Sequence, residues 1–373
     1  MRVLARILIP LVLALGAVAA LAGTASATPG SGRPVFVLND NPAGNQVVAY
    51  DADATGALQQ AGVYSTGGLG GILTGSVVDH TASQGALAYD PSHDLLLASN
   101  PGSSTISVFQ ANGDKLALTQ QIDSGGAFPV SIAAHDGVIY VLNALDGGSL
   151  QGFRAVGQHL FAIAGSHRDL GLGTTAASPF TATPGQVAFS PDGSQLLVTT
   201  KGSGNAIDVF AVDTSGGISA SPTVNVDAGA VPFAVAFDPN GDVAVAEAGT
   251  NSVATFSLAS NGVLTLLHRA ATGQAATCWV TATGSFLYAS NAGSGSVTGY
   301  AAGAGGSLAS LGNTAAAAGA VDSSATPDGA FLYVQTGAAG AVSGFRIESN
   351  GALTPVGSVT VPGAAGAEGI VAL

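Results

Sequence analysis

The chain has 373 residues, of which 47% are hydrophobic and only 8% are charged, with 9 basic and 22 acidic side chains. A net negative charge with so few lysines and arginines argues against a nucleic-acid partner, whose phosphates need basic patches, and against anionic membrane surfaces. The high hydrophobic content excludes a disordered chain, and the single cysteine excludes an intrachain disulfide.

The first 27 residues have the pattern of a secretory signal peptide. Arg2 and Arg6 form a basic start, residues 7–22 form an apolar core, and an Ala-Ser-Ala sequence ends at Ala27. This pattern predicts cleavage after Ala27 and secretion of residues 28–373 to an extracellular location. No later stretch reaches the roughly 18 uninterrupted apolar residues that a transmembrane helix needs, so no membrane span is predicted after cleavage.

The rest of the chain repeats one unit, which is clearest at residues 187–219, VAFSPDGSQLLVTTKGSGNAIDVFAVDTSGGIS. Residues 191–193, Pro-Asp-Gly, have the chemistry of a tight turn. Residues 195–200 and 206–212 are rich in β-branched side chains and are flanked by turn formers, which is typical of strands. Such a unit forms a small antiparallel sheet that cannot bury both of its faces alone, so its copies must stack.

Seven copies can be counted along the chain. The clearest marker is an aromatic residue in the third strand of each unit: Tyr50, Phe109, Phe153, Phe210, Phe256, Tyr300 and Phe345. The turn between the first two strands recurs only six times, and the missing turn would precede residues 34–40. Residues 368–373 form one surplus strand, which would complete the first sheet by pairing with residues 34–40. We therefore predict an all-β fold for residues 28–373: a single seven-bladed β-propeller with four-stranded antiparallel blades, its ring closed by the C-terminal strand pairing into the first blade.

The predicted blades differ mainly in the loops that connect them. Their expected ranges, in chain order, are 34–65, 85–125, 128–164, 185–230, 231–273, 275–318 and 319–362. Two connections are long, residues 66–84 and residues 165–184. Both join the last strand of one blade to the first strand of the next, so both should lie on one face of the ring. Long loops in a compact fold are usually functional or disordered, and the alternative for the second is a decoration of the rim.

The repeat also predicts a ring of residues on this face. The positions nine residues before each marker aromatic are Asn41, Asn100, Ala144, Lys201, Glu247, Asn291 and Thr336, with Asn143 as the alternative in the third blade. The asparagines suit left-handed turn geometry. Lys201 and Glu247 stand at matching positions in adjacent blades, and if both point inward they should form an ion pair at the mouth of the central channel. Such a pair has either a functional or a structural role.

The sequence lacks most other motifs of catalysis and cofactor binding. It contains no G-x-S-x-G, no H-E-x-x-H, no paired Cys-x-x-Cys and no G-x-G-x-x-G. Residues 238–242 loosely resemble a calcium loop, but the same register holds an ordinary turn in other repeats. Cys278 stands in an apolar run and is interpreted as a small buried hydrophobic residue. We therefore predict no metal site and no cofactor.

Two of the repeats, VAFSPDGSQLLVTTKGSGNAIDVFAVDTSGGIS and WVTATGSFLYASNAGSGSVTGYAAGAGGSL, resemble those of the lactonase family of seven-bladed propellers. That family includes bacterial 6-phosphogluconolactonases and fungal carboxymuconate cyclases. The resemblance covers the chain from residue 34 to residue 373. The segments GQAATCWV, VAVAEAGTNSVATF and LLVTTKGSGNAIDVF are similar to a group of secreted actinobacterial propellers of unassigned activity.

The resemblance implies a lactone hydrolase, with departures from the family pattern. Family members typically begin a blade with Pro-Arg-His, whereas residues 232–234 read Pro-Phe-Ala. The glutamate of the family is retained as Glu247, although Ala246 replaces the asparagine before it. Opening a lactone needs a base that activates water and a cation that stabilises the oxyanion. The resemblance therefore implies Glu247 as the base and Lys201 as the cation.

Further residues are candidates for binding a ligand at the mouth of the central funnel. They are Asn41, Asn100, Arg168, Asn291 and Trp279. Arg168, on the second long connection, would reach a carboxylate or phosphate with two hydrogen bonds. The alternative to a lactonase is a non-catalytic extracellular binding or interaction scaffold. The predicted partner is a small molecule or an extracellular protein, and the protein is expected to be a monomer.

Overall fold

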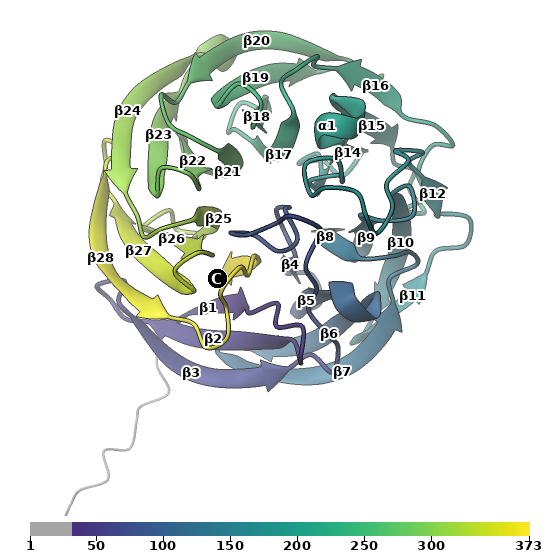
Figure 1. Cartoon of the computed structure of the whole chain (residues 1–373), viewed down its shortest axis with the longest axis horizontal. Helices are drawn as coiled ribbons and strands as arrows, with labels where there is room; N and C mark the ends of the chain where they lie inside the picture. Colours follow the sequence, from purple (N-terminus) through teal and green to yellow (C-terminus); the bar gives the residue numbers. More distant parts are fainter. Residues whose placement is uncertain (1–31) are drawn as a thin grey trace, which may run out of the picture. The chain divides into compact units, whose positions relative to one another are not determined.

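A computed structural model describes residues 32–373 of the chain (Figure 1). The predicted signal peptide, residues 1–27, lies outside the described residues. Residues 32–373 form a ring of seven antiparallel sheets, which confirms the predicted seven-bladed propeller. None of the helices in this part of the chain is long and apolar enough to cross a membrane.

Within each blade the strands are ordered from the innermost, at the central channel, to the outermost, at the rim. The first blade consists of β29 (Ile370–Ala372), β1 (Arg33–Leu38), β2 (Gln46–Ala52) and β3 (Leu58–Ser65). The second consists of β4 (Leu87–Asp90), β5 (Leu95–Asn100), β6 (Thr105–Asn112) and β7 (Lys115–Asp123). The third has five strands, β8 (Pro129–His135), β9 (Val138–Asn143), β10 (Ser149–Val156), β11 (His159–Ala162) and β12 (Arg168–Asp169).

The remaining four blades have four strands each. The fourth consists of β13 (Val187–Phe189), β14 (Gln195–Thr199), β15 (Ala206–Ala211) and β16 (Thr223–Val226). The fifth consists of β17 (Pro232–Phe237), β18 (Val243–Glu247), β19 (Ser252–Leu258) and β20 (Leu264–Ala271). The sixth consists of β21 (Thr277–Thr283), β22 (Phe286–Asn291), β23 (Ser296–Ala302) and β24 (Leu308–Ala315). The seventh consists of β25 (Ala320–Ala325), β26 (Phe331–Thr336), β27 (Ala341–Ile347) and β28 (Leu353–Thr360). Three helical turns lie in loops, α1 (Lys201–Gly204) and the 3-10 turns Pro101–Ser103 and Ala304–Gly306.

The C-terminal strand closes the ring, as predicted. Strand β29 is the innermost strand of the first blade and pairs with β1 in the register Val35↔Ala372, Phe36↔Val371 and Val37↔Ile370. Backbone hydrogen bonds of 2.9 Å extend this pairing at both ends. The last residues of the chain therefore complete the sheet that the first described residues begin.

The core lies between neighbouring blades. All seven marker aromatics lie in the third strands and are at most 7% exposed. Tyrosines of the second strands also reach the next blade, since the Tyr140 hydroxyl donates to the Gly216 carbonyl (2.8 Å) and the Tyr288 hydroxyl to the Gly351 carbonyl (2.9 Å). The aromatic side chain thus recurs in each unit because it fills the space between two stacked sheets.

Two long connections distinguish this ring. The first insert (residues 66–86) joins β3 to β4, and in Figure 1 part of it lies near the centre of the ring, between β25 and β8. The second insert (residues 170–186) joins β12 to β13. The two touch, because the Phe180 amide donates to the Thr74 carbonyl (3.1 Å) and the Thr74 hydroxyl to the Ala176 carbonyl (3.0 Å). Both inserts therefore lie on one face, as predicted, and we call it the insert face.

Candidate functional site

Seven side chains fasten the second strand of each blade to the third on the insert face. Each hydrogen-bonds the first residue of the third strand, and each is at most 1% exposed. These latch residues are Asn39, Asn100, Asn143, Thr200, Glu247, Asn291 and Thr336. The predicted ring of residues therefore exists, but its side chains are used inside the blades and do not edge an open funnel.

The strand register corrects three members of the predicted ring. Counting nine residues back from the aromatic identifies the latch only where the loop between the second and third strands has the common length. In the first, third and fourth blades this loop is longer, so the latches are Asn39, Asn143 and Thr200. Asn143 was the alternative considered for the third blade. Lys201 follows the latch residue Thr200 and is not equivalent to Glu247.

Glu247 does not pair with Lys201, so the predicted ion pair is wrong. The Glu247 carboxylate is fully buried and is held by the Arg269 guanidinium through Nε (2.7 Å to Oε2) and Nη2 (2.7 Å to Oε1). The Ser252 hydroxyl donates to Oε2 at 2.6 Å. Arg269 also pairs with Asp227 at 2.8 Å. A base in this environment has its lone pairs occupied and no access to a substrate.

Lys201 fastens the two inserts to each other. Its ammonium group is buried and donates three hydrogen bonds, to the Ala82 carbonyl (2.6 Å), the Phe180 carbonyl (2.7 Å) and the Thr183 hydroxyl (2.9 Å). It also lies 5.0 Å from the centre of the Phe233 ring. Burial lowers the pKa of Lys201 to about 7, and the charge of Asp79 opposes this shift. With all three protons donated within the fold, Lys201 has none left to stabilise an oxyanion.

The other predicted ligand-binding residues are not brought together. Arg168 lies on β12, where its guanidinium donates to the carbonyls of Ile218 (2.7 Å) and Ser219 (2.9 Å). Asn41 caps its own loop, because its side chain accepts a hydrogen bond from the Ala43 amide (2.9 Å). Asn100 and Asn291 are latch residues, as described above. Of the five candidates, Trp279 lines a cavity on this face.

Residues 79–86 of the first insert cross the channel and form a plug. Hydrogen bonds join this plug to three blades: Ser83 Oγ to Val130 O on β8 (2.8 Å), Gln84 Nε2 to Val280 O on β21 (2.9 Å), and Gly85 N to Glu368 Oε1 next to β29 (2.7 Å). Residues 81–83 are at most 3% exposed. The only sequence signal for this path is a polar run inside a glycine-rich loop, and it does not predict that the loop crosses the channel.

A pair of buried carboxyl groups secures the plug next to the ring closure. Glu368 is fully buried, and its Oε2 lies within hydrogen-bonding distance of Thr81 Oγ1 (3.2 Å) and Ser83 Oγ (3.1 Å). Asp322 of β25 lies near enough to the Glu368 carboxyl group for its charge to act on it. Burial raises the pKa of both groups, and the charge of Asp322 raises that of Glu368 further. Burial and the closeness of the two groups therefore both favour protonation of Glu368 in the folded state.

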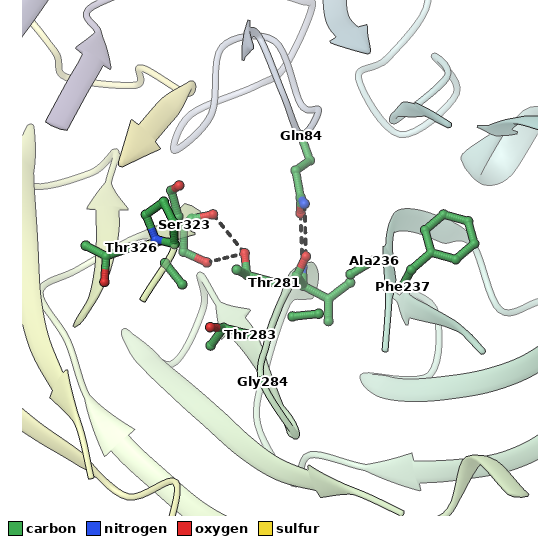
Figure 2. Close-up of a pocket in the computed structure, with 13 residues that line it drawn as sticks. Gln84, Ala236, Phe237, Thr281, Thr283, Gly284, Ser323 and Thr326 are labelled. Atoms are coloured by element: carbon green, nitrogen blue, oxygen red, sulfur yellow. Dashed lines mark hydrogen bonds between the residues drawn. The ribbon is translucent and has the colours of Figure 1, made fainter. Parts of the chain in front are cut away.

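A pocket of about 530 Å³ occupies the channel on the side of the plug away from the inserts (Figure 2). It is lined by the plug residue Gln84 and by residues of the innermost strands and turns of three blades: Ala236, Phe237, Val280, Thr281, Ala282, Thr283, Gly284, Ser323, Ser324, Ala325, Thr326 and Pro327. In Figure 2, Gln84 reaches toward the strand that carries Thr281, and Thr281 is hydrogen-bonded to Ser323. The Gln84 amide also accepts from the Val280 backbone at 3.0 Å. We call this the channel pocket, and none of its lining residues is ionisable.

A family model described as lactonase, 7-bladed beta-propeller matches residues 173–367, which is more than half of the chain. The protein belongs to this lactonase family. The resemblance stated from the repeat motifs is therefore confirmed.

Solved structures of lactonase-family type share the fold. A putative 6-phosphogluconolactonase from Bacteroides fragilis is 18% identical with a TM-score of 0.73, and the match covers 93% of this chain and 100% of that one. The periplasmic gluconolactonase PpgL of Pseudomonas aeruginosa is 16% identical with a TM-score of 0.70, and the match covers 92% of this chain and 99% of that one. At these identities the likeness shows the fold alone. A search of curated proteins finds no match.

The lactonase-family match includes only part of the candidate site. Residues 173–367 contain the strands of the fifth, sixth and seventh blades that line the channel pocket. The plug, residues 79–86, precedes the matched segment. The floor of the pocket, made by Gln84, therefore lies outside the matched segment.

Proposed function

We propose that this lactonase-family propeller binds a small, uncharged, hydroxyl-rich molecule in the channel pocket, such as an unphosphorylated sugar or sugar lactone. The pocket lining carries the proposal, because it combines hydroxyl and amide groups with one aromatic ring and has no ionisable side chain. Threonine and serine hydroxyls both donate and accept, and so does the Gln84 amide, so they match a polyol whose groups do the same. The volume of about 530 Å³ lies in the usual range for ligand pockets.

A phosphorylated or carboxylated ligand fits this lining poorly. Recognition of phosphate or carboxylate uses arginine or lysine, because a charged donor is needed to offset the desolvation of the anion. The pocket offers no such donor, and the chain carries 22 acidic against 9 basic residues. The name of PpgL, a gluconolactonase, supports an unphosphorylated sugar lactone as a member of the ligand class.

Lactone hydrolysis is the second candidate function, and family membership favours it. The residues available argue for binding without turnover, because Glu247 is ion-paired to Arg269 and Lys201 is saturated within the fold. The pocket itself supplies neither a base nor a cation. We place the action outside the cell, on the signal-like pattern of residues 1–27.

A binding screen with a filled-pocket variant tests the proposal. Glucose, glucono-δ-lactone, gluconate and 6-phosphogluconate are each added to the purified protein, and thermal unfolding is followed. At about 100 times the Kd an uncharged ligand should stabilise the parent by about 2.7 kcal/mol. Thr283→Leu, which fills the pocket, should abolish this shift, whereas Thr265→Leu on the exposed outer strand β20 should not.

Three results would decide against binding in the channel pocket. The first is the absence of a shift with either uncharged compound, and the second is an equal shift in Thr283→Leu. The third is a preference for the two anions. Release of acid from glucono-δ-lactone, recorded by pH-stat and lost in Thr283→Leu, would establish the hydrolase instead.

A further inference from the structure

A second cavity lies on the insert face, on the other side of the plug from the channel pocket. Its volume is about 130 Å³. Both inserts and the fifth and sixth blades contribute to it through Ser76, Val77, Val78, Asp79, Ala82, Phe180, Phe233, Ala276, Cys278, Trp279 and Ala292. We call it the insert cavity. It shares no lining residue with the channel pocket, so it requires a separate explanation.

The walls of the insert cavity are aromatic and aliphatic. The Phe233 and Trp279 rings lie with their centres 5.0 Å apart at an interplanar angle of 60°. Phe180 comes from the second insert, and Val77 and Val78 come from the first. Aromatic rings prefer tilted or offset neighbours at centroid distances of about 4.5–7 Å. Phe233 and Trp279 thus pack against each other at a favourable distance, and both rings line the cavity.

The polar atoms around the insert cavity are satisfied by the protein. The Trp279 indole N–H donates to the Ser83 carbonyl at 2.6 Å. The Asp79 carboxylate accepts from three backbone amides, those of Thr81, Ala82 and Ser83, at 2.8–2.9 Å. Burial raises the pKa of the Cys278 thiol to about 12, so the thiol stays protonated and uncharged. A ligand in this cavity therefore meets apolar surface and finds no free charge.

The size of the insert cavity selects a ligand of one ring. An apolar cavity of about 150 Å³ stays dry and accepts benzene, and the insert cavity has nearly this volume. Val77 lines it and is 79% exposed, so an apolar side chain stands uncovered at its rim. A bound ring would remove both the void and part of this exposed surface from water.

We infer that the insert cavity binds one uncharged aromatic ring, either as a benzene-sized molecule or as the phenyl group of a larger ligand. This site is independent of the channel pocket, because the plug separates the two. The inserts close the cavity over the ring, and Lys201 ties them together beside it.

Fluorobenzene provides a direct probe, because Trp279 is the only tryptophan of the chain and lines the cavity. Binding is followed by ¹⁹F NMR of the ligand and by Trp279 fluorescence of the whole protein. From the ligand efficiency of very small ligands we expect a Kd of about 1 mM or tighter. Cyclohexanecarboxylate, an anion of similar size, should bind at least tenfold more weakly.

Two variants locate the binding. Ala292→Leu fills the insert cavity and should weaken fluorobenzene binding at least tenfold. Val77→Asp should do the same by placing a charge at the rim, and it is expected to fold because Val77 is exposed. Ile72→Asp is the matched control, since Ile72 is 51% exposed on the same insert and does not line the cavity. No saturable binding by the parent, or equal binding by the parent and Val77→Asp, would overturn the inference.

Discussion

Replacing Glu247 by glutamine distinguishes a structural role of this residue from a catalytic role. The substitution keeps the shape of the side chain, removes its charge and turns an amide donor toward the Arg269 guanidinium, which is itself a donor. Breaking a buried ion pair by removing one partner costs about 3–5 kcal/mol. Arg269 is 36% exposed in its side chain and keeps Asp227 as a partner, so water and the second carboxylate reduce the loss. We expect Glu247→Gln to lower the free energy of unfolding by about 2–3 kcal/mol.

Equilibrium unfolding in urea, followed by Trp279 fluorescence, measures this loss. Glu348→Gln is the matched control, because Glu348 is a partly exposed glutamate outside the Glu247 cluster, and it should change stability by less than about 0.5 kcal/mol. In the double variant with Arg269→Met, the two effects should not add, since each substitution removes the same ion pair. If Glu247→Gln is as stable as the parent, the ion pair with Arg269 does not stabilise the fold. The carboxylate of Glu247 in the parent would then be available for chemistry.

Three further substitutions test the plug, the latches and the ring closure. Burial raises the pKa of Glu368 and Asp322, so the folded state favours their protonated forms, and this contribution to stability is full below about pH 4 and is lost as the pH rises through the raised values. Glu368→Gln should therefore gain stability relative to the parent as the pH rises above about 4 in urea titrations, and a difference that stays constant with pH would contradict the raised pKa of Glu368. Asn143→Ala removes a fully buried latch and should lower the free energy of unfolding by about 1–3 kcal/mol, whereas Asn41→Ala should lower it by less than about 1 kcal/mol. Equal losses would contradict the assignment of Asn143 as a latch residue and of Asn41 as a loop residue. Ile370→Ala in the closing strand, at a position only 4% exposed, should cost about 2–4 kcal/mol by the same assay, and a loss below about 1 kcal/mol would show that β29 contributes little.

The fold could be predicted because local and global signals agree in this chain. Turn formers recur between short β-branched runs, and a buried aromatic marks the third strand of each blade. Ring closure could be predicted because the sequence has seven marker aromatics but only six turns between first and second strands. The first blade therefore lacks one strand, which residues 368–373 supply. The observed pairing of Phe36 with Val371 is the consequence.

The candidate site could be predicted only in part, because the sequence does not determine where loops go. Counting identifies the latch residues Asn100, Glu247, Asn291 and Thr336, but the longer loop of the fourth blade displaces Lys201 by one position and changes its environment. The partner of Glu247 was missed because Arg269 lies on the exposed outer strand of the same blade, 22 residues away. Neither the path of residues 79–86 across the channel nor the pocket beneath Gln84 has a periodic signal.

The plug supports the proposal that this propeller binds a ligand without turning it over. The ionisable side chains near the channel axis hold the plug in place: Asp79 caps its backbone, Lys201 ties it to the second insert, and Glu368 anchors it to the closing strand. Each of these groups is almost fully buried and makes its hydrogen bonds within the fold. What remains on either side of the plug is a hydroxyl-lined pocket on one face and, on the other, an aromatic cavity whose Asp79 carboxylate is already hydrogen-bonded by backbone amides. On the two proposals made above, a hydroxyl-rich ligand and an aromatic ligand would bind on opposite sides of the segment that uses the charges a hydrolase would need.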